Sequence, residues 1–358
     1  MSSEFGNKIK ISVFGQSHGE AIGVVINGLP SGEAIDFDEL QAFMERRRGG
    51  KNAFSTKRSE ADIPEFVSGI ANGKTCGMPL CAIIRNGDKR SSDYSELLDK
   101  PRPGHADYTA FVKWSGNADM RGGGHFSGRL TAPLCIAGGI AKQILARRGI
   151  YVGAHLDSVA GIRDKRFEMT DGKAIFEEIA AKDFPVINDI KGEEMKAAII
   201  SAAGELDSVG GVIECGITGA PVGIGAPFFG SVESRISSMM FSIPAIKGIE
   251  FGAGFGFAKM TGKDANDEFY TEDGKIKTYT NNNAGINGGI TNGMPVVFRT
   301  VVKPTPSISQ SQKTVDIKKM ENTEVVVKGR HDPCIVGRAV PVIEAGAAIA
   351  ILDMLKVK

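Results

Sequence analysis

The order in which strand-like and helix-like segments follow one another constrains the fold of this chain more than any other feature. Two short runs rich in β-branched residues open the sequence, at residues 8–15 and 21–27, and the glycine-bearing turn between them predicts a hairpin. Further strand-like runs lie at residues 65–70, 80–84, 151–161, 208–218 and 295–303. Helix-like patterns lie at residues 36–48, 127–148, 190–203, 232–241 and 341–355. Because the two kinds of segment alternate without a strict strand–helix–strand rhythm, the pattern favours an α+β fold over a doubly wound parallel sheet.

Local signals mark the starts of two of these helices. Asp36 is a good N-terminal cap, and Leu40 and Met44 fall on one face of the helix that follows it. Pro341 is a good first-turn residue and predicts the start of the last helix. The sequence has no linker rich in Pro, Ser or charge and no internal repeat, so we expect a single domain over residues 1–358.

Charge and composition exclude several classes of protein. The 43 Lys and Arg residues nearly balance the 42 Asp and Glu residues, so a formal net charge of +1 gives no sequence-wide reason to expect a nucleic acid or an anionic membrane as partner. The longest apolar stretches are interrupted by Lys142 and Glu344, so no membrane span is expected either. The five cysteines form no C-x-x-C pair, which suits free thiols in a reducing compartment and predicts a cytoplasmic protein.

Glycine is unusually frequent, with 46 residues and no Gly-X-Y period. It permits tight turns and close approach of the backbone to a ligand. Common nucleotide motifs nevertheless fail on spacing, because residues 69–75 are one residue short of a P-loop and residues 252–256 lack the third glycine of a dinucleotide fingerprint. No familiar metal-binding spacing appears in the sequence, so we expect no metal site.

One short motif suggests a hydrolase. Residues 15–19, Gly-Gln-Ser-His-Gly, match the G-x-S-x-G nucleophile elbow of serine hydrolases and follow a credible strand. An elbow requires a helix directly after the serine, whereas residues 21–26 are typical of a strand. A hydrolase that uses Ser17 is therefore one alternative, and a plain hairpin turn is the other reading of the motif.

Histidine and arginine gather in the glycine-rich segments. Four of the five histidines lie in loop-like segments, beside Gly, Pro or Arg: His18, His105, His125 and His331. Arginines in or beside glycine-rich segments are Arg46, Arg47, Arg48, Arg102, Arg121, Arg129 and Arg330. Imidazole transfers protons at neutral pH, and guanidinium groups bind phosphate or carboxylate in bidentate fashion. These segments therefore predict pockets for a small polyanion, either in an enzyme or in a non-catalytic anion-binding protein.

Six blocks of sequence are distinctive when they are taken together: Phe14-Gly-Gln-Ser-His-Gly19, Arg46-Arg-Arg-Gly-Gly50, Arg102-Pro-Gly-His-Ala-Asp107, Arg121-Gly-Gly-Gly124, Lys303-Pro-Thr-Pro-Ser307 and Gly329-Arg-His-Asp-Pro-Cys334. In their order and spacing, over essentially the whole chain, these blocks resemble the chorismate synthase family. The resemblance implies a lyase that converts 5-enolpyruvylshikimate 3-phosphate to chorismate and phosphate, the last step of the shikimate pathway. This 1,4-elimination needs reduced FMN although no net redox change occurs.

The resemblance also assigns roles by position. The catalytic residues would be His18, His105, Asp332, Ser17 and Ser127. The substrate anions would be bound by Arg47, Arg48, Arg102 and Arg129. Reduced FMN would contact His125, Phe126, Ser127, Ala245, Gly288, Lys303, Pro304, Thr305, Pro306, Ser307 and Arg330. Within this set the chain departs from the family, because residues 125–130 read His-Phe-Ser-Gly-Arg-Leu where relatives carry Arg-Ser-Ser-Ala-Arg-Glu.

The family's architecture and partners complete the expectation. Relatives are homotetramers of a single-domain βαβ-sandwich, in which helices flank antiparallel or mixed sheets. Some relatives reduce their own flavin with NADPH, and others depend on a separate reductase. Because residues 252–256 do not form a dinucleotide fingerprint, we expect NADPH to act only as an external flavin reductant.

Overall fold

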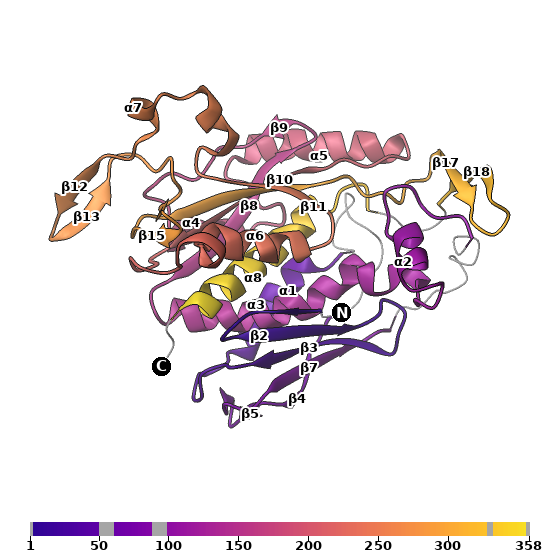
Figure 1. Cartoon of the computed structure of the whole chain (residues 1–358), viewed down its shortest axis with the longest axis horizontal. Coiled ribbons are helices and arrows are strands. Elements are labelled where there is room, and N and C mark those ends of the chain that lie inside the picture. The colour runs from indigo at the N-terminus through magenta and orange to yellow at the C-terminus, as the bar shows by residue number, and fades with distance from the viewer. Residues whose placement is uncertain (1–2, 50–60, 88–98, 328–331, 356–358) are drawn as a thin grey trace.

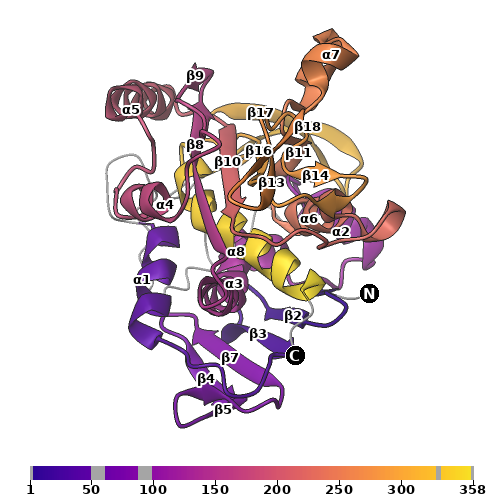
Figure 2. The same cartoon turned by 90° about the vertical axis from the view of Figure 1, so that its left-hand side faces the viewer.

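Two antiparallel sheets enclose a layer of helices in the computed structural model of the chain, which describes residues 3–49, 61–87, 99–327 and 332–355 (Figures 1 and 2). The first sheet has the strand order β1 (Glu4–Phe5), β2 (Lys10–Gly15), β3 (Ala21–Asn27), β7 (Leu80–Arg85), β4 (Glu65–Ser68). The second has the order β11 (Ile246–Phe251), β16 (Val296–Val302), β10 (Gly211–Thr218), β8 (Tyr151–Val159), β9 (Ile162–Arg163). The α+β fold and the βαβ-sandwich are confirmed.

The helices between the sheets supply nearly half of the buried hydrophobic core residues. They are α1 (Phe37–Arg47), α3 (Thr131–Ala146), α6 (Val232–Ser242) and α8 (Val336–Met354). Helix α3 packs on β3 and β7 of the first sheet, and α8 packs on β8 and β10 of the second. The two helices cross closely because α3 has no side chain at Gly138, where a Cβ would lie 2.1 Å from the Cβ of Ala345. An apolar surface on nearly every side of α3 and α8 is what a helix in the middle layer requires.

Shorter elements decorate this sandwich. Helices α4 (Lys173–Ala180) and α5 (Asp189–Gly204) pack against β8, and α2 (Asp107–Lys113) and α7 (Gly262–Ala265) stand apart from the middle layer. The small hairpins are β5 (Ile70–Ala71) with β6 (Lys74–Thr75), β12 (Phe269–Glu272) with β13 (Lys275–Thr278), β14 (Ile286–Asn287) with β15 (Ile290–Thr291), and β17 (Ser311–Asp316) with β18 (Glu321–Val326). The 3₁₀ helices are η2 (Arg121–Phe126), η3 (Gly128–Leu130), η4 (Phe228–Gly230) and η5 (Gly254–Lys259).

The sequence predicted most of the large elements and misplaced two helix starts, one of which is that of α3, which begins at Thr131 and not at residue 127. The hairpin of β2 and β3 is present, and the Asp36 carboxylate caps α1 by accepting hydrogen bonds from the backbone N–H groups of Asp38 and Glu39. The last helix, however, begins at Val336, five residues before the predicted start, so Pro341 lies inside it. A proline there removes one hydrogen bond to the carbonyl of Gly337, and the burial of α8 outweighs that loss.

Two further features of the described residues concern the chain's surroundings. None of the helices in these ranges is long and apolar enough to cross a lipid bilayer. All five cysteines lie within the described ranges, and each is a free thiol.

Candidate active site

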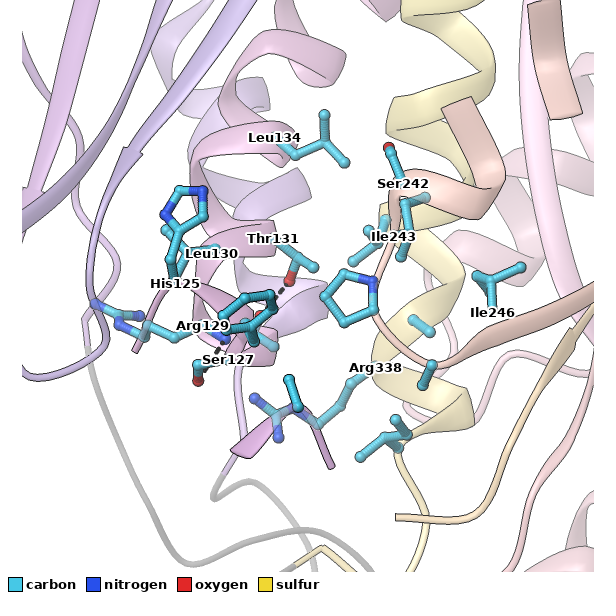
Figure 3. A pocket seen from close by; sticks show the side chains of 18 of the residues that line it. His125, Ser127, Arg129, Leu130, Thr131, Leu134, Ser242, Ile243, Ile246 and Arg338 are labelled. Atoms are coloured by element: carbon cyan, nitrogen blue, oxygen red, sulfur yellow. Dashed lines mark hydrogen bonds between the residues drawn. The ribbon is translucent and has the colours of Figure 1, made fainter. Parts of the chain in front are cut away.

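A cavity of about 850 Å³ opens where the two sheets and the middle layer meet. Its walls come from β1 and β2, the end of α1, the loop at residues 102–106, the turns before α3, the segment after α6, residues 303–307 and the start of α8. In Figure 3, Ser127, Arg129 and Arg338 lie in the lower half of the view, and the apolar side chains of Leu134 and Ile243 lie above them. The cavity therefore combines a charged wall with an apolar wall.

Two histidines, His18 and His105, contact a run of three glycines in η2. Gly122, Gly123 and Gly124 all have positive φ angles, of 62°, 92° and 55°. A Cβ on Gly122 would lie 1.8 Å from the ring of His18, and a Cβ on Gly123 would lie 3.4 Å from the Cε1 and Nε2 atoms of His105. Only glycine lets the backbone turn in this way beneath an aromatic ring. Residues that are 87 positions apart in the printed sequence thus meet on one turn.

His18 and Ser17 lie behind this turn. His18 is 6% exposed and Ser17 is fully buried, and neither lines the cavity, which is bounded there by Gly122. The backbone N–H of Ser17 donates to the carbonyl of Gly124 at 3.1 Å, and the Ser17 hydroxyl has no hydrogen-bond partner among the described residues. The turn that carries Ser17 runs directly into strand β3, so it is not a nucleophile elbow. This geometry argues against the serine hydrolase.

His105 belongs to a second group, with Asp107 and Arg102. The His105 Nδ1 atom lies 2.7 Å from Asp107 Oδ1, and Arg102 donates from Nε to Asp107 Oδ2 at 2.7 Å and from Nη2 to Oδ1 at 2.8 Å. Arg102 Nη1 also donates to the hydroxyl of Ser307 at 3.3 Å. Burial alone would raise the pKa of Asp107, but the hydrogen bonds from Arg102 and His105 outweigh it and hold that pKa well below its ordinary value. Asp107 is therefore a carboxylate at neutral pH.

A third group joins two predicted substrate-binding arginines. Asp62, which is 3% exposed, accepts a hydrogen bond from Arg47 Nη2 on one carboxylate oxygen and from Arg129 Nη1 on the other. Arg129 Nε donates to Asn86 Oδ1 at 3.2 Å. Burial would raise the pKa of Asp62, yet the two guanidinium groups lower it. One buried carboxylate thus fixes two cations along the charged wall.

Asp332 also lies along the charged wall, and it pairs with Arg338, a residue that the sequence did not predict for the site. Arg338 donates from Nη1 to Asp332 Oδ2 and from Nε to the backbone carbonyl of Arg47 at 3.0 Å. Arg338 lies in the first turn of α8. The predicted helix starts at Pro341, so Arg338 falls outside it. Asp62 was also missed, because its partners Arg47 and Arg129 come from other segments of the sequence. Asp107 received no role either, although its partners Arg102 and His105 stand in the same block of sequence.

The predicted flavin contacts fall into two sets. Eight of the eleven predicted flavin contacts line the cavity: His125, Phe126, Ser127, Ala245, Lys303, Thr305, Pro306 and Ser307. His125 Nδ1 lies 2.8 Å from the carbonyl of Gly15, and its Nε2 lies 2.8 Å from Ser3 Oγ. Pro304 does not line the cavity, and Gly288 is in the exposed turn between β14 and β15, away from its described walls. Arg330 and His331 lie outside the described residues.

The family model, the relatives and the solved structure that match this chain are all described as chorismate synthase. The family model described as chorismate synthase matches residues 9–355. The chorismate synthase of Lancefieldella parvula is 43% identical over 99% of this chain and 96% of its own length, and that of Dehalococcoides mccartyi is 45% identical with the same coverage. The chorismate synthase of Thermococcus kodakarensis is 44% identical over 98% of this chain and 96% of its own length. A solved structure described as a crystal structure of chorismate synthase superposes with a TM-score of 0.74 at 27% identity, over 98% of this chain and 92% of that one. The chain therefore belongs to the chorismate synthase family.

Proposed function

We propose that the chain is a lyase that converts 5-enolpyruvylshikimate 3-phosphate to chorismate and inorganic phosphate. In this 1,4-elimination a C–O bond to phosphate and a distant C–H bond break, and phosphate and a proton leave. The observation that carries the proposal is that His18 and His105, far apart in sequence, share one glycine turn beside a wall of buried arginines. Membership of the chorismate synthase family over residues 9–355 supports the same reaction.

The charged wall suits a substrate with one phosphate and two carboxylates. We propose that Arg47 and Arg129 bind these anions, with Arg48 at the rim of the cavity. Because Asp62 holds Arg47 and Arg129 each through one guanidinium nitrogen, it orients the planar groups before substrate arrives. Arg102 also lines the cavity, but its Nε and both terminal nitrogens donate to Asp107 or Ser307, which favours a positioning role for this side chain.

We propose that reduced FMN binds in the rest of the cavity. A volume of about 850 Å³ with an apolar wall that includes Leu134 and Ile243 is large enough for a substrate and a flavin ring together. The Thr305 hydroxyl is buried without a hydrogen-bond partner among the described residues, so residues 303–307 offer a donor to a polar cofactor. When bound, reduced FMN supplies the electron-rich ring that this elimination requires without net oxidation.

The proposed flavin contacts are those of the cavity wall. His125, Phe126, Ser127, Ala245, Lys303, Thr305, Pro306 and Ser307 would hold the cofactor, with Arg330 and the backbone near Pro304 completing the set. The Lys303 ammonium donates to the carbonyl of Gly104, which ties this segment to the loop of His105. Gly288 would reach the flavin only if the exposed turn between β14 and β15 met another part of the assembly.

In the proposed reaction, the two histidines and the carboxylate of Asp332 transfer the protons. We propose that His18 protonates the departing phosphate, which leaves more easily when its growing charge meets a proton. His105 would exchange a proton at Nε2, which lies over the glycine turn, and Asp332, held by Arg338, would assist removal of the substrate proton. Ser17 and Ser127 would donate hydrogen bonds within the same site.

The remaining expectations concern assembly and supply of electrons. We propose that the chain acts as a cytoplasmic homotetramer and receives reduced flavin from outside, by a separate reductase that oxidises NADPH. The absence of a dinucleotide fingerprint in the sequence supports the external reductant, and the unpaired cysteines support a reducing compartment. Analytical ultracentrifugation and an NADPH oxidation assay with oxidised FMN would test the two proposals separately.

Turnover under reducing conditions tests the function itself. Pure protein, reduced FMN and 5-enolpyruvylshikimate 3-phosphate are incubated without oxygen, and chorismate and phosphate are measured. The proposal expects both products. A serine hydrolase would instead be labelled at Ser17 by a phosphonate probe, and an anion-binding protein would bind the substrate without forming either product.

A further inference from the structure

One loop folds a carboxylate back onto a proposed catalytic histidine. Asp107 begins helix α2 and is 9% exposed, and both of its oxygens are occupied. Oδ2 accepts hydrogen bonds from Arg102 Nε at 2.7 Å and from the Arg102 backbone N–H at 3.0 Å. Oδ1 accepts from Arg102 Nη2 at 2.8 Å and faces His105 Nδ1 at 2.7 Å. The family resemblance gives Asp107 no role, and the network gives it a candidate one.

The distances determine which nitrogen of His105 carries hydrogen. A carboxylate oxygen is an acceptor, so an imidazole nitrogen 2.7 Å away must be a donor, since two lone pairs at that distance repel. Arg102 Nη2 also lies 3.1 Å from His105 Nδ1, but a guanidinium nitrogen has no lone pair with which to accept. Nδ1 therefore bears the hydrogen, and Nε2 is the nitrogen that exchanges a proton.

The position of Nε2 matches such a role. A Cβ on Gly123 would lie 3.4 Å from Nε2, so this nitrogen rests over the glycine turn, and His105 lines the cavity. Arg102 in turn is held at its far end, because Nη1 donates to Ser307, which also lines the cavity. The chain of contacts thus runs from the proposed flavin segment through Arg102 and Asp107 to His105.

We propose that Asp107 is a positioning residue that fixes the tautomer and the direction of His105, and that Arg102 holds Asp107 in place. The inference rests on the proposed function, which gives His105 its proton-transfer role. A carboxylate that orients a histidine in this way recurs in unrelated enzymes, where it selects the tautomer and steadies the ring. The same contacts could instead only fasten the loop to α2, and the experiments below separate the two roles.

The first experiment reads the tautomer without substrate or cofactor. Long-range ¹H–¹⁵N NMR of the full chain labelled at histidine nitrogen distinguishes a protonated ring nitrogen from a bare one. For neutral His105 the wild-type spectrum should show hydrogen on Nδ1 and a bare Nε2. Hydrogen on Nε2 in the wild-type protein would overturn the inference, whatever any variant does.

The Asp107→Asn variant should reverse that assignment. Two N–H groups of Arg102 donate to the Oδ2 position and only one, from Nη2, donates to Oδ1, so the amide oxygen is better placed at Oδ2 and the amide NH₂ faces His105. Nδ1 must then accept, and the hydrogen moves to Nε2. Asp157→Asn is the matched control, because Asp157 is also buried and bonded to an arginine, Arg166, in the distant second sheet. An unchanged His105 tautomer in Asp107→Asn would contradict the proposal.

A double-mutant cycle gives the kinetic test. Asp107→Asn should slow turnover by about 10²–10⁴-fold in the wild-type background, as expected for loss of one oriented proton carrier. In the His105→Ala background the same change should cost less than about threefold, since the residue acts through His105. An equal loss in both backgrounds would assign Asp107 a purely structural role. If the tautomer reverses but wild-type protein forms no chorismate, the positioning stands and the proposed function fails.

Discussion

Gly122 lies beneath the imidazole of His18 so closely that a Cβ on residue 122 would stand 1.8 Å from the ring atoms Cε1 and Nδ1. The next glycine, Gly123, bears the same relation to His105 at a longer distance of 3.4 Å. The two histidines that we propose as proton carriers therefore contact one glycine turn. If both histidines transfer protons as proposed, this arrangement would hold both of them in one site.

Gly122→Ala should disable the enzyme through His18. The new methyl group would displace the ring, and a φ of 62° adds strain for any residue with a Cβ. We expect a fall in kcat of at least about 10²-fold, comparable to removing a positioned proton donor. Gly161→Ala is the control, because Gly161 has a φ of 83° with nothing within 4 Å of its added Cβ. Near-normal kcat in Gly122→Ala would refute the seating of His18 on this turn.

His18→Ala and His105→Ala should each slow turnover by about 10²–10⁴-fold and leave the fold intact. Both changes remove a side chain from a turn outside the main hydrophobic core, so circular dichroism and thermal unfolding should match the wild type. Steady-state kinetics without oxygen provides the measurement. A variant that keeps activity within threefold of the wild type would lose its place in the mechanism.

Arg129→Lys should weaken substrate binding. Lysine keeps the charge but cannot contact Asp62, Asn86 and a substrate anion with one planar group. We expect KM to rise by about 10–100-fold, which corresponds to the loss of one charge-assisted hydrogen bond. Arg147→Lys, at a 40% exposed arginine that pairs with Glu33 on the surface, should leave KM unchanged. Equal KM values in the two variants would place Arg129 outside the substrate site.

Glu344 should make stability depend on acid. Burial raises the pKa of this carboxyl group, but Arg46 and Lys142 outweigh burial and lower the pKa to about 2, below its ordinary value of 4.5. A depressed pKa stabilises the folded state above pH 4.5, and that contribution is lost as the pH falls from about 4.5 to about 2. Glu344→Gln should lower the free energy of unfolding by about 3 kcal/mol at pH 7.

Urea unfolding at several pH values measures this effect. The difference between wild type and Glu344→Gln should shrink toward zero as the pH approaches 2. Glu177→Gln is the control, because Glu177 forms an exposed ion pair with Lys173, and such pairs contribute little. A Glu344→Gln difference that is independent of pH would show that the carboxylate charge is not the stabilising feature.

Local signals explain which elements the sequence could predict. The cap at Asp36 and the apolar face of α1 depend on neighbours in sequence, and the structure has both. Pro341 gave a wrong start for the last helix, because the preference of proline for a first turn is a local rule. Helix α8 continues through Pro341 because it is buried against α3 and the second sheet. The same limit applies to the site. The contacts of Asp62 with Arg129 and of Arg338 with the Arg47 backbone join distant segments, and no periodicity records them.

The resemblance to a family supplied what local rules could not. It singled out His18, His105, Arg47, Arg129 and Asp332, and the structure gathers these residues in or beside one cavity. Their roles in catalysis and substrate binding stay predictions. Arg338 entered only from the structure, as the partner of Asp332, and Asp107, which stands in one of the six blocks, gained a role only through its contact with His105.

The stoichiometry of the two products tests the central claim most directly. Wild-type protein, reduced FMN and 5-enolpyruvylshikimate 3-phosphate are mixed without oxygen, and phosphate and chorismate are quantified in the same quenched samples over time. The account predicts equal molar amounts of both products at every time point, and neither product when reduced FMN is omitted. Phosphate release without chorismate, or release that persists with oxidised FMN, would show hydrolysis in place of elimination and would contradict the account.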